Sequence, residues 1–193
     1  MSRRYGNAQT IGSNVTQNTY FMTKQVGQGF FAVLADGTID SVTGAYAAIL
    51  ACETIAKGFV SLEDVEGQLE KQFARAAAVM NERLYKGRQP RVSVLAACFV
   101  GNSMVYRSVG DLSVALCGSR GLTVNQEASG QMDVKGATTL LCSQGVWQAL
   151  AEMDIEKLLS GRRHPYDKAQ NIIEAVNRRN LKDQKSALAV IVA

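Results

Sequence analysis

Residues 30–48 read FFAVLADGTIDSVTGAYAA, and this stretch decides the fold. Its first part, Phe30–Ala35, is almost wholly apolar, which is typical of a strand buried on both faces. Asp36-Gly37 follows directly, and a carboxylate at the end of a buried strand costs free energy unless it is paired or metal-bound. Residues 40–57 are then apolar almost all round, which predicts a helix that other parts of the chain cover. The stretch therefore predicts a core strand that ends at a polar site.

On both sides of this stretch, the predicted strands and helices come in separate blocks along the chain. A strand over Tyr20–Val26 precedes this stretch and is joined to it by Gly27-Gln28-Gly29, a hairpin signal. After it, an amphipathic helix begins near Ser61 with a capping-box-like pattern and carries an apolar stripe to Leu84. The remaining predicted elements are four strands at hairpin spacing, a short strand, three helices and a closing strand, over Arg91–Val100, Met104–Val109, Leu112–Cys117, Gly121–Gln126, Thr138–Cys142, Gly145–Leu150, Asp154–Leu159, Pro165–Arg178 and Ser186–Val192.

This segregated order favours an α+β fold over an alternating α/β fold. Two antiparallel sheets packed together, with helices outside each sheet, would bury every apolar face. The chain has 193 residues, of which 47% are hydrophobic and 20% charged, and this length suits one domain. We therefore expect a four-layer αββα sandwich in which residues 1–193 form a single domain.

The amino-acid composition indicates which classes of partner and which cellular compartment to expect. The net charge is +4, but the basic residues are spread in loose pairs such as Arg162-Arg163 and Arg178-Arg179, without interleaved aromatics. That pattern indicates a solvated surface rather than a nucleic-acid-binding face. No apolar run approaches the ~20 residues of a membrane span, so no membrane partner is expected. Four cysteines lie far apart in apolar segments, which predicts reduced, buried thiols and a cytoplasmic protein.

The candidate catalytic or metal-binding residues are acidic residues that lie beside glycines or at strand ends. They are Asp36-Gly37, Gly110-Asp111 and Asp183. His164 is the single histidine, which argues against a histidine metal cage or a Ser-His-Asp triad. Taken alone, each aspartate is better explained as an ordinary turn residue than as a functional group.

Taken together, four segments resemble motifs of the metal-dependent type 2C protein phosphatases, the PPM family. Residues 30–48 resemble its F-x-V-x-D-G stretch, and residues 91–127 resemble its G-D-S-R region. Residues 138–150, TTLLCSQGVWQAL, resemble L-L-x-S-D-G-L-W-D-x-L, and residues 181–193, LKDQKSALAVIVA, resemble D-N-x-T-x-x-x-V. Their order and context agree, so the resemblance, to a minimal and degenerate bacterial-like member, covers nearly the whole chain.

The resemblance implies a two-sheet αββα sandwich with two Mn²⁺ or Mg²⁺ ions at one end. These ions clamp and acidify the water that attacks a phosphate, so no side chain is assigned as the nucleophile. By this resemblance, the metal positions are Asp36 as the bridging aspartate, Gly37 as a carbonyl donor and Asp183 as the D-N aspartate. Asp111 falls on the G-D-S-R aspartate, near an additional metal position in some members.

Other motif positions depart from the family pattern. Gln17 and Asn18 stand in place of N-E-D, and Gln144 stands in place of the S-D-G aspartate. Ser13 falls on the phosphate-binding arginine, and Thr38 begins the altered segment after D-G. Amides bring no charge to a metal, and loss of the arginine removes bidentate phosphate recognition. We therefore expect Mn or Mg binding to be weak or absent.

Three functions are compatible with these residues. The first is a pseudophosphatase, a binding or regulatory module in phospho-signalling whose partner is a phosphoprotein, a kinase or another signalling protein. The second is an active minimal Mn/Mg-dependent phosphatase of phosphoserine and phosphothreonine with an altered metal site. The third is an unrelated αββα hydrolase with Ser2 as an N-terminal nucleophile, which is disfavoured because no strand is predicted to begin there.

Overall fold

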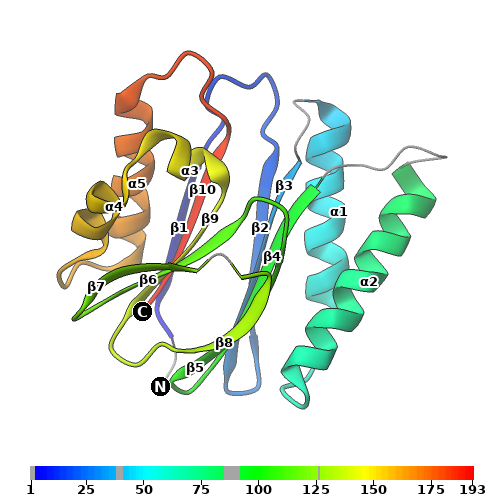
Figure 1. The fold of residues 1–193 in the computed structure, drawn as a ribbon. Coiled ribbons are helices and arrows are strands. Elements are labelled where there is room, and N and C mark those ends of the chain that lie inside the picture. Colours follow the sequence, from blue (N-terminus) through cyan, green and yellow to red (C-terminus); the bar gives the residue numbers. More distant parts are fainter. Residues whose placement is uncertain (1–2, 38–40, 85–91, 126) are drawn as a thin grey trace.

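Two antiparallel five-stranded sheets pack face to face in the computed structural model, which describes residues 3–37, 41–84, 92–125 and 127–193 (Figure 1). The first sheet has the order β2 (Thr19–Val26), β3 (Gly29–Gly37), β4 (Val92–Val100), β5 (Ser103–Val109) and β8 (Ser129–Asp133). The second has the order β1 (Tyr5–Thr10), β10 (Ala187–Val192), β9 (Thr138–Cys142), β6 (Ser113–Gly118) and β7 (Gly121–Asn125).

Helices cover the outer face of each sheet (Figure 1). Against the first sheet lie α1 (Val42–Gly58) and α2 (Val65–Leu84), and against the second lie α3 (Gln144–Ala149), α4 (Glu152–Leu159) and α5 (Pro165–Arg179). The predicted α+β class and the four-layer αββα sandwich are confirmed.

Strand β3 is buried on both faces, as its apolar sequence predicts. Phe31 and Val33 pack beneath α1, while Phe30 and Leu34 pack between the sheets with Leu141. Burying one such side chain contributes on the order of 2 kcal/mol to stability. The strand is therefore firmly held, and so is the position of the residues at its end.

Two strands were not predicted from the sequence. Strand β1 reads YGNAQT and β8 reads SGQMD, and neither carries an alternating apolar pattern. Both are edge strands, held by backbone pairing to β10 and to β5 respectively. Backbone pairing leaves little trace in side-chain hydrophobicity, which explains the omission.

The predicted run of four hairpin-spaced strands is divided between the two sheets. β4 pairs with β5 and β6 pairs with β7, but β5 and β6 belong to different sheets. The chain crosses over at Gly110, whose φ is 87°, and a Cβ there would lie 2.3 Å from Oγ of Ser93. Because a side chain cannot be accommodated, glycine is required at this crossing.

The cysteines are buried and free, as predicted. Burial raises the pKa of Cys98 to about 11, which keeps this thiol protonated at neutral pH. Among the described residues, none of the helices has the length and apolar character to cross a membrane.

Candidate functional site

A small polar cavity lies where the end of β3 meets the start of β10. Its volume is about 160 Å³, and it draws residues from the first sheet, from the start of α3 and from several connecting segments. The residues that line it are Asn14, Asn18, Asp36, Gly37, Ser93, Asp111, Gln144, Lys185 and Ser186. Sequence motifs separated by more than a hundred residues therefore meet at one end of the sandwich.

Strand register places Asp36 in this cavity. Asp36 lies opposite Thr19 on β2 and opposite Ser93 on β4, so hydrogen-bonded strands flank it on both sides. Burial raises the pKa of Asp36 to about 6; the attraction of Lys185 opposes this shift and the charge of Asp111 adds to it. The Asp36 carboxyl is thus poorly solvated and depends on a nearby cation for its charged form.

Gly37 brings the end of β3 against the first turn of α1. Its N–H donates to the carbonyl of Asn18 at 3.0 Å. A Cβ at this position would lie 2.2 Å from the carbonyl oxygen of Gly44, closer than any real contact. The glycine of the Asp36-Gly37 pair is therefore a packing requirement, whatever its carbonyl binds.

Lys185 supplies a cation to the cavity from the residue pair before β10. Its ammonium donates a hydrogen bond to Oε1 of Gln144. Its backbone N–H donates to Oε1 of Gln148 at 2.9 Å, so α3 holds both ends of the residue. Lys185 matches no position of the family motifs and was not predicted; it lies two residues beyond Asp183.

Asp111 reaches the cavity from the crossing between the sheets. Its backbone N–H donates to the hydroxyl of Ser93 at 3.0 Å, and Ser93 is buried. Together with Asp36 it makes two carboxylates at the site. Asn14, Ser93 and Ser186 also line the cavity without having been predicted; as common loop and strand residues, they carried no signal in the sequence.

Three predicted positions do not line the cavity. Ser13 links two loops, because its hydroxyl donates to the carbonyl of Lys182 at 2.8 Å and accepts from the N–H of Gln184 at 3.1 Å. Gln17 donates to the hydroxyl of Thr19. Asp183 is exposed, and its carbonyl oxygen accepts from Gln148 at 2.8 Å.

Of the other predicted positions, Asp36, Gly37, Asn18, Asp111 and Gln144 line the cavity. Thr38 lies outside the described residues.

The donor set in this cavity does not fit a pair of divalent ions. Hard cations such as Mn²⁺ and Mg²⁺ take several oxygen ligands, mostly carboxylates. Within the described ranges, no three His, Cys, Asp or Glu residues are grouped as a metal site requires. The Oε1 of Gln144 accepts from Lys185, whose ammonium has no lone pair to offer a metal. The cavity already contains one fixed positive charge.

No family model matches the chain, and no curated protein matches it by sequence. Solved structures match it over nearly their whole length. The catalytic domain of the phosphatase PstP, solved with two manganese ions, superposes with a TM-score of 0.83 at 16% identity, over 98% of this chain and 97% of its own. The PPM Ser-Thr phosphatase MsPP from Mycobacterium smegmatis gives 0.80 at 13% identity, over 97% of each chain.

A third structure comes from the bacterial stressosome, described as a modular system adapted to control secondary messenger signaling. It gives a TM-score of 0.74 at 13% identity, over 100% of both chains. The chain therefore has the two-sheet αββα fold of the PPM-type serine/threonine phosphatases.

Proposed function

We propose that this chain is a pseudophosphatase, a PPM-type phosphatase-like domain that acts as a binding or regulatory module in cytoplasmic phospho-signalling. One observation carries the proposal: the ammonium of Lys185 bonds Gln144 in the cavity that Asp36 lines. PstP, which shares the fold, holds two manganese ions. In this chain a lysine provides positive charge in the cavity at the end of β3.

Charge explains why the lysine disfavours a divalent ion. Two unit charges about 4 Å apart interact by about 4 kcal/mol at an effective dielectric near 20, and a divalent ion doubles this repulsion. The carboxylates of Asp36 and Asp111 would have to overcome it while Gln144 is engaged by the same lysine. Mn or Mg binding is accordingly expected to be weak or absent.

A regulatory role is supported by the range of proteins that share this fold. The stressosome structure belongs to a system adapted to control secondary messenger signaling. For this chain the corresponding partner would be a phosphoprotein, a kinase or another signalling protein.

The second candidate is an active minimal phosphatase with an altered metal site. The presence of two carboxylates, Asp36 and Asp111, in one cavity favours it, because carboxylates are the ligands that Mn²⁺ and Mg²⁺ prefer. It would require an ion to bind beside the ammonium of Lys185.

Hydrolysis of p-nitrophenyl phosphate with millimolar Mn²⁺ separates the two candidates. We expect neither the natural chain nor the Asp36→Asn variant to hydrolyse the substrate faster than the background rate. A turnover near 1 s⁻¹ or faster, the ordinary enzymatic range, that Asp36→Asn abolishes would establish the enzyme instead.

A further inference from the structure

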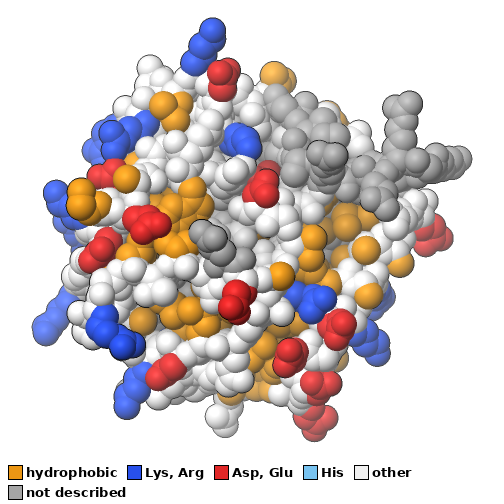
Figure 2. Space-filling model, viewed as in Figure 1, with side chains coloured by type: hydrophobic (Ala, Val, Ile, Leu, Met, Phe, Trp, Pro, Cys, Tyr) orange, Lys and Arg blue, Asp and Glu red, His pale blue; other side chains and the backbone are white. Residues whose placement is uncertain are grey.

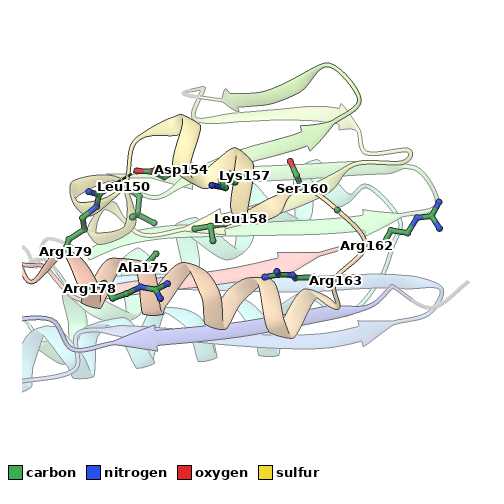
Figure 3. Close-up of a pocket in the computed structure, with 11 residues that line it drawn as sticks. Leu150, Asp154, Lys157, Leu158, Ser160, Arg162, Arg163, Ala175, Arg178 and Arg179 are labelled. Carbon is green, nitrogen blue, oxygen red and sulfur yellow. Dashed lines mark hydrogen bonds and ion pairs between the residues drawn. The ribbon is translucent and has the colours of Figure 1, made fainter.

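A larger groove, with a volume of about 740 Å³, lies between α4 and α5 on the outer face of the second sheet (Figure 3). It shares no lining residue with the cavity at Asp36. Five basic side chains line it: Lys157 on α4, Arg162 and Arg163 in the connection, and Arg178 and Arg179 at the end of α5. Figure 2 shows Lys and Arg side chains along the left edge of the molecule, over these helices, with a few acidic ones among them.

One acidic residue lines this groove, and it is already paired. Asp154 accepts from Arg179 at 2.6 Å, and each side chain keeps about half of its exposure. Within the described part of the chain, no carboxylate lies within ion-pair distance of Lys157, Arg162, Arg163 or Arg178. The groove thus has an excess of four positive charges, which equals the formal net charge of +4 of the whole chain. Outside the groove, the acidic and basic residues balance.

Apolar residues line the groove together with the cations. Leu150, Leu158 and Ala175 contribute the apolar part, while Ile155 and Leu159 on the inner side of α4 are buried in the core and fix the helix. Lys157 extends from α4, Arg163 and Arg178 lie along α5, and Arg162 extends away from the others (Figure 3). Cations therefore flank a short apolar strip.

We propose that this groove binds an acidic peptide segment of a protein partner, in which carboxylates flank an apolar side chain. Arginine is well suited to hold carboxylates, and Asp154 already accepts one hydrogen bond from the guanidinium of Arg179 in the groove. The apolar strip accepts the side chain between the carboxylates.

The shape and lining of the groove favour a peptide over other anionic partners. A single-stranded nucleic acid is disfavoured because, among the described residues, no aromatic side chain lines the groove for base stacking. A membrane is disfavoured because a concave surface cannot lie against a flat bilayer. The proposal does not depend on whether the cavity at Asp36 binds metal.

A labelled pentapeptide tests the proposal. We expect Glu-Glu-Leu-Glu-Glu to bind the full chain in low salt and to weaken as salt is raised, because exposed charge pairs are screened. Gln-Gln-Leu-Gln-Gln should not bind measurably. Glu-Glu-Gly-Glu-Glu should bind at least about 3-fold more weakly, because it lacks the apolar side chain that Leu158 and Ala175 would contact.

Charge-reversal variants locate the binding surface. The double variant R163E/R178E should weaken binding of the acidic peptide about 10-fold or more, since two attractions become repulsions. The matched control K71E/R75E reverses two exposed cations on α2 and should change binding less than about 2-fold. The melting temperatures of both variants should match that of the natural chain. This control establishes that each variant folds.

Equal binding by the natural chain and the R163E/R178E variant would overturn the proposal. So would tighter binding to duplex DNA, or to vesicles with anionic phosphatidylglycerol, that is lost in R163E/R178E, because the groove would then serve a different class of partner.

Discussion

The ammonium of Lys185 donates a hydrogen bond to Oε1 of Gln144, and both residues line the cavity that also holds Asp36. Gln144 begins α3 and Lys185 lies just before β10 of the second sheet, whereas Asp36 belongs to β3 of the first sheet. A positive charge of the chain itself thus attracts a carboxyl group that burial makes costly to ionise.

Asp36→Asn should stabilise the protein at pH 7. The pKa of Asp36 rises from 3.8 to about 6 on folding, so the folded state binds more protons than the unfolded state between these values. Stability contributed by this group is therefore present below pH 4 and is lost as the pH rises to 6. The loss corresponds to at most about 3 kcal/mol at neutral pH.

Urea denaturation at pH 7 and at pH 3.5 measures this effect. We expect Asp36→Asn to raise the free energy of unfolding by about 1–3 kcal/mol at pH 7 and by almost nothing at pH 3.5. An equal gain at both pH values would mean that the carboxyl's ionisation is not the cause.

Lys185→Met should raise the pKa of Asp36 above its value in the natural chain. Removing the ammonium eliminates the one attraction that opposes the effect of burial. Titration of the Asp36 carboxyl by carbon NMR measures the midpoint directly. Lys182→Met removes an exposed lysine three positions earlier and should leave this midpoint unchanged. An unchanged midpoint in Lys185→Met would show that the lysine does not act on Asp36.

Gly37→Ala should destabilise the fold by about 2 kcal/mol or more, because a Cβ at this position would overlap the carbonyl of Gly44. Gly118→Ala is the matched control, since its Cβ would meet only the side chain of Ala137 at an ordinary 3.8 Å. Thermal melts of the two variants provide the comparison. Equal melting temperatures would show that the end of β3 can move away from α1 at little cost.

The sequence predicted the parts of the fold that side-chain hydrophobicity controls. FFAVLA over residues 30–35 indicated a strand buried on both faces, and Asp36 accordingly lies at its polar end. Strands β1 and β8 were missed because pairing of their backbones, rather than apolar side chains, holds them in the sheets. The crossing at Gly110 was also missed, because hairpin spacing does not reveal which sheet a strand joins.

The site was predicted only in part, because motif spacing does not fix where a strand begins. Asp183 was singled out by its resemblance to a D-N motif, but β10 begins at Ala187 and Lys185 lines the cavity instead. The basic groove was missed for a similar reason. Arg162-Arg163 and Arg178-Arg179 are separate pairs in the sequence, and only the packing of α4 against α5 brings them together.

The central claim is that Lys185 occupies the cavity as a cation and so excludes a metal ion. Its most direct test is a thermal melt of the natural chain and of one double variant, each with and without 1 mM Mn²⁺. The double variant K185D/Q144D replaces the lysine and its amide partner with two potential carboxylate ligands. We expect Mn²⁺ to raise the melting temperature of this variant by about 3–6 °C, because an ion that binds only the folded state stabilises it. The natural chain should show no Mn²⁺-dependent rise. A rise in the natural chain as large as in K185D/Q144D would contradict the account, because Lys185 would then not exclude the ion.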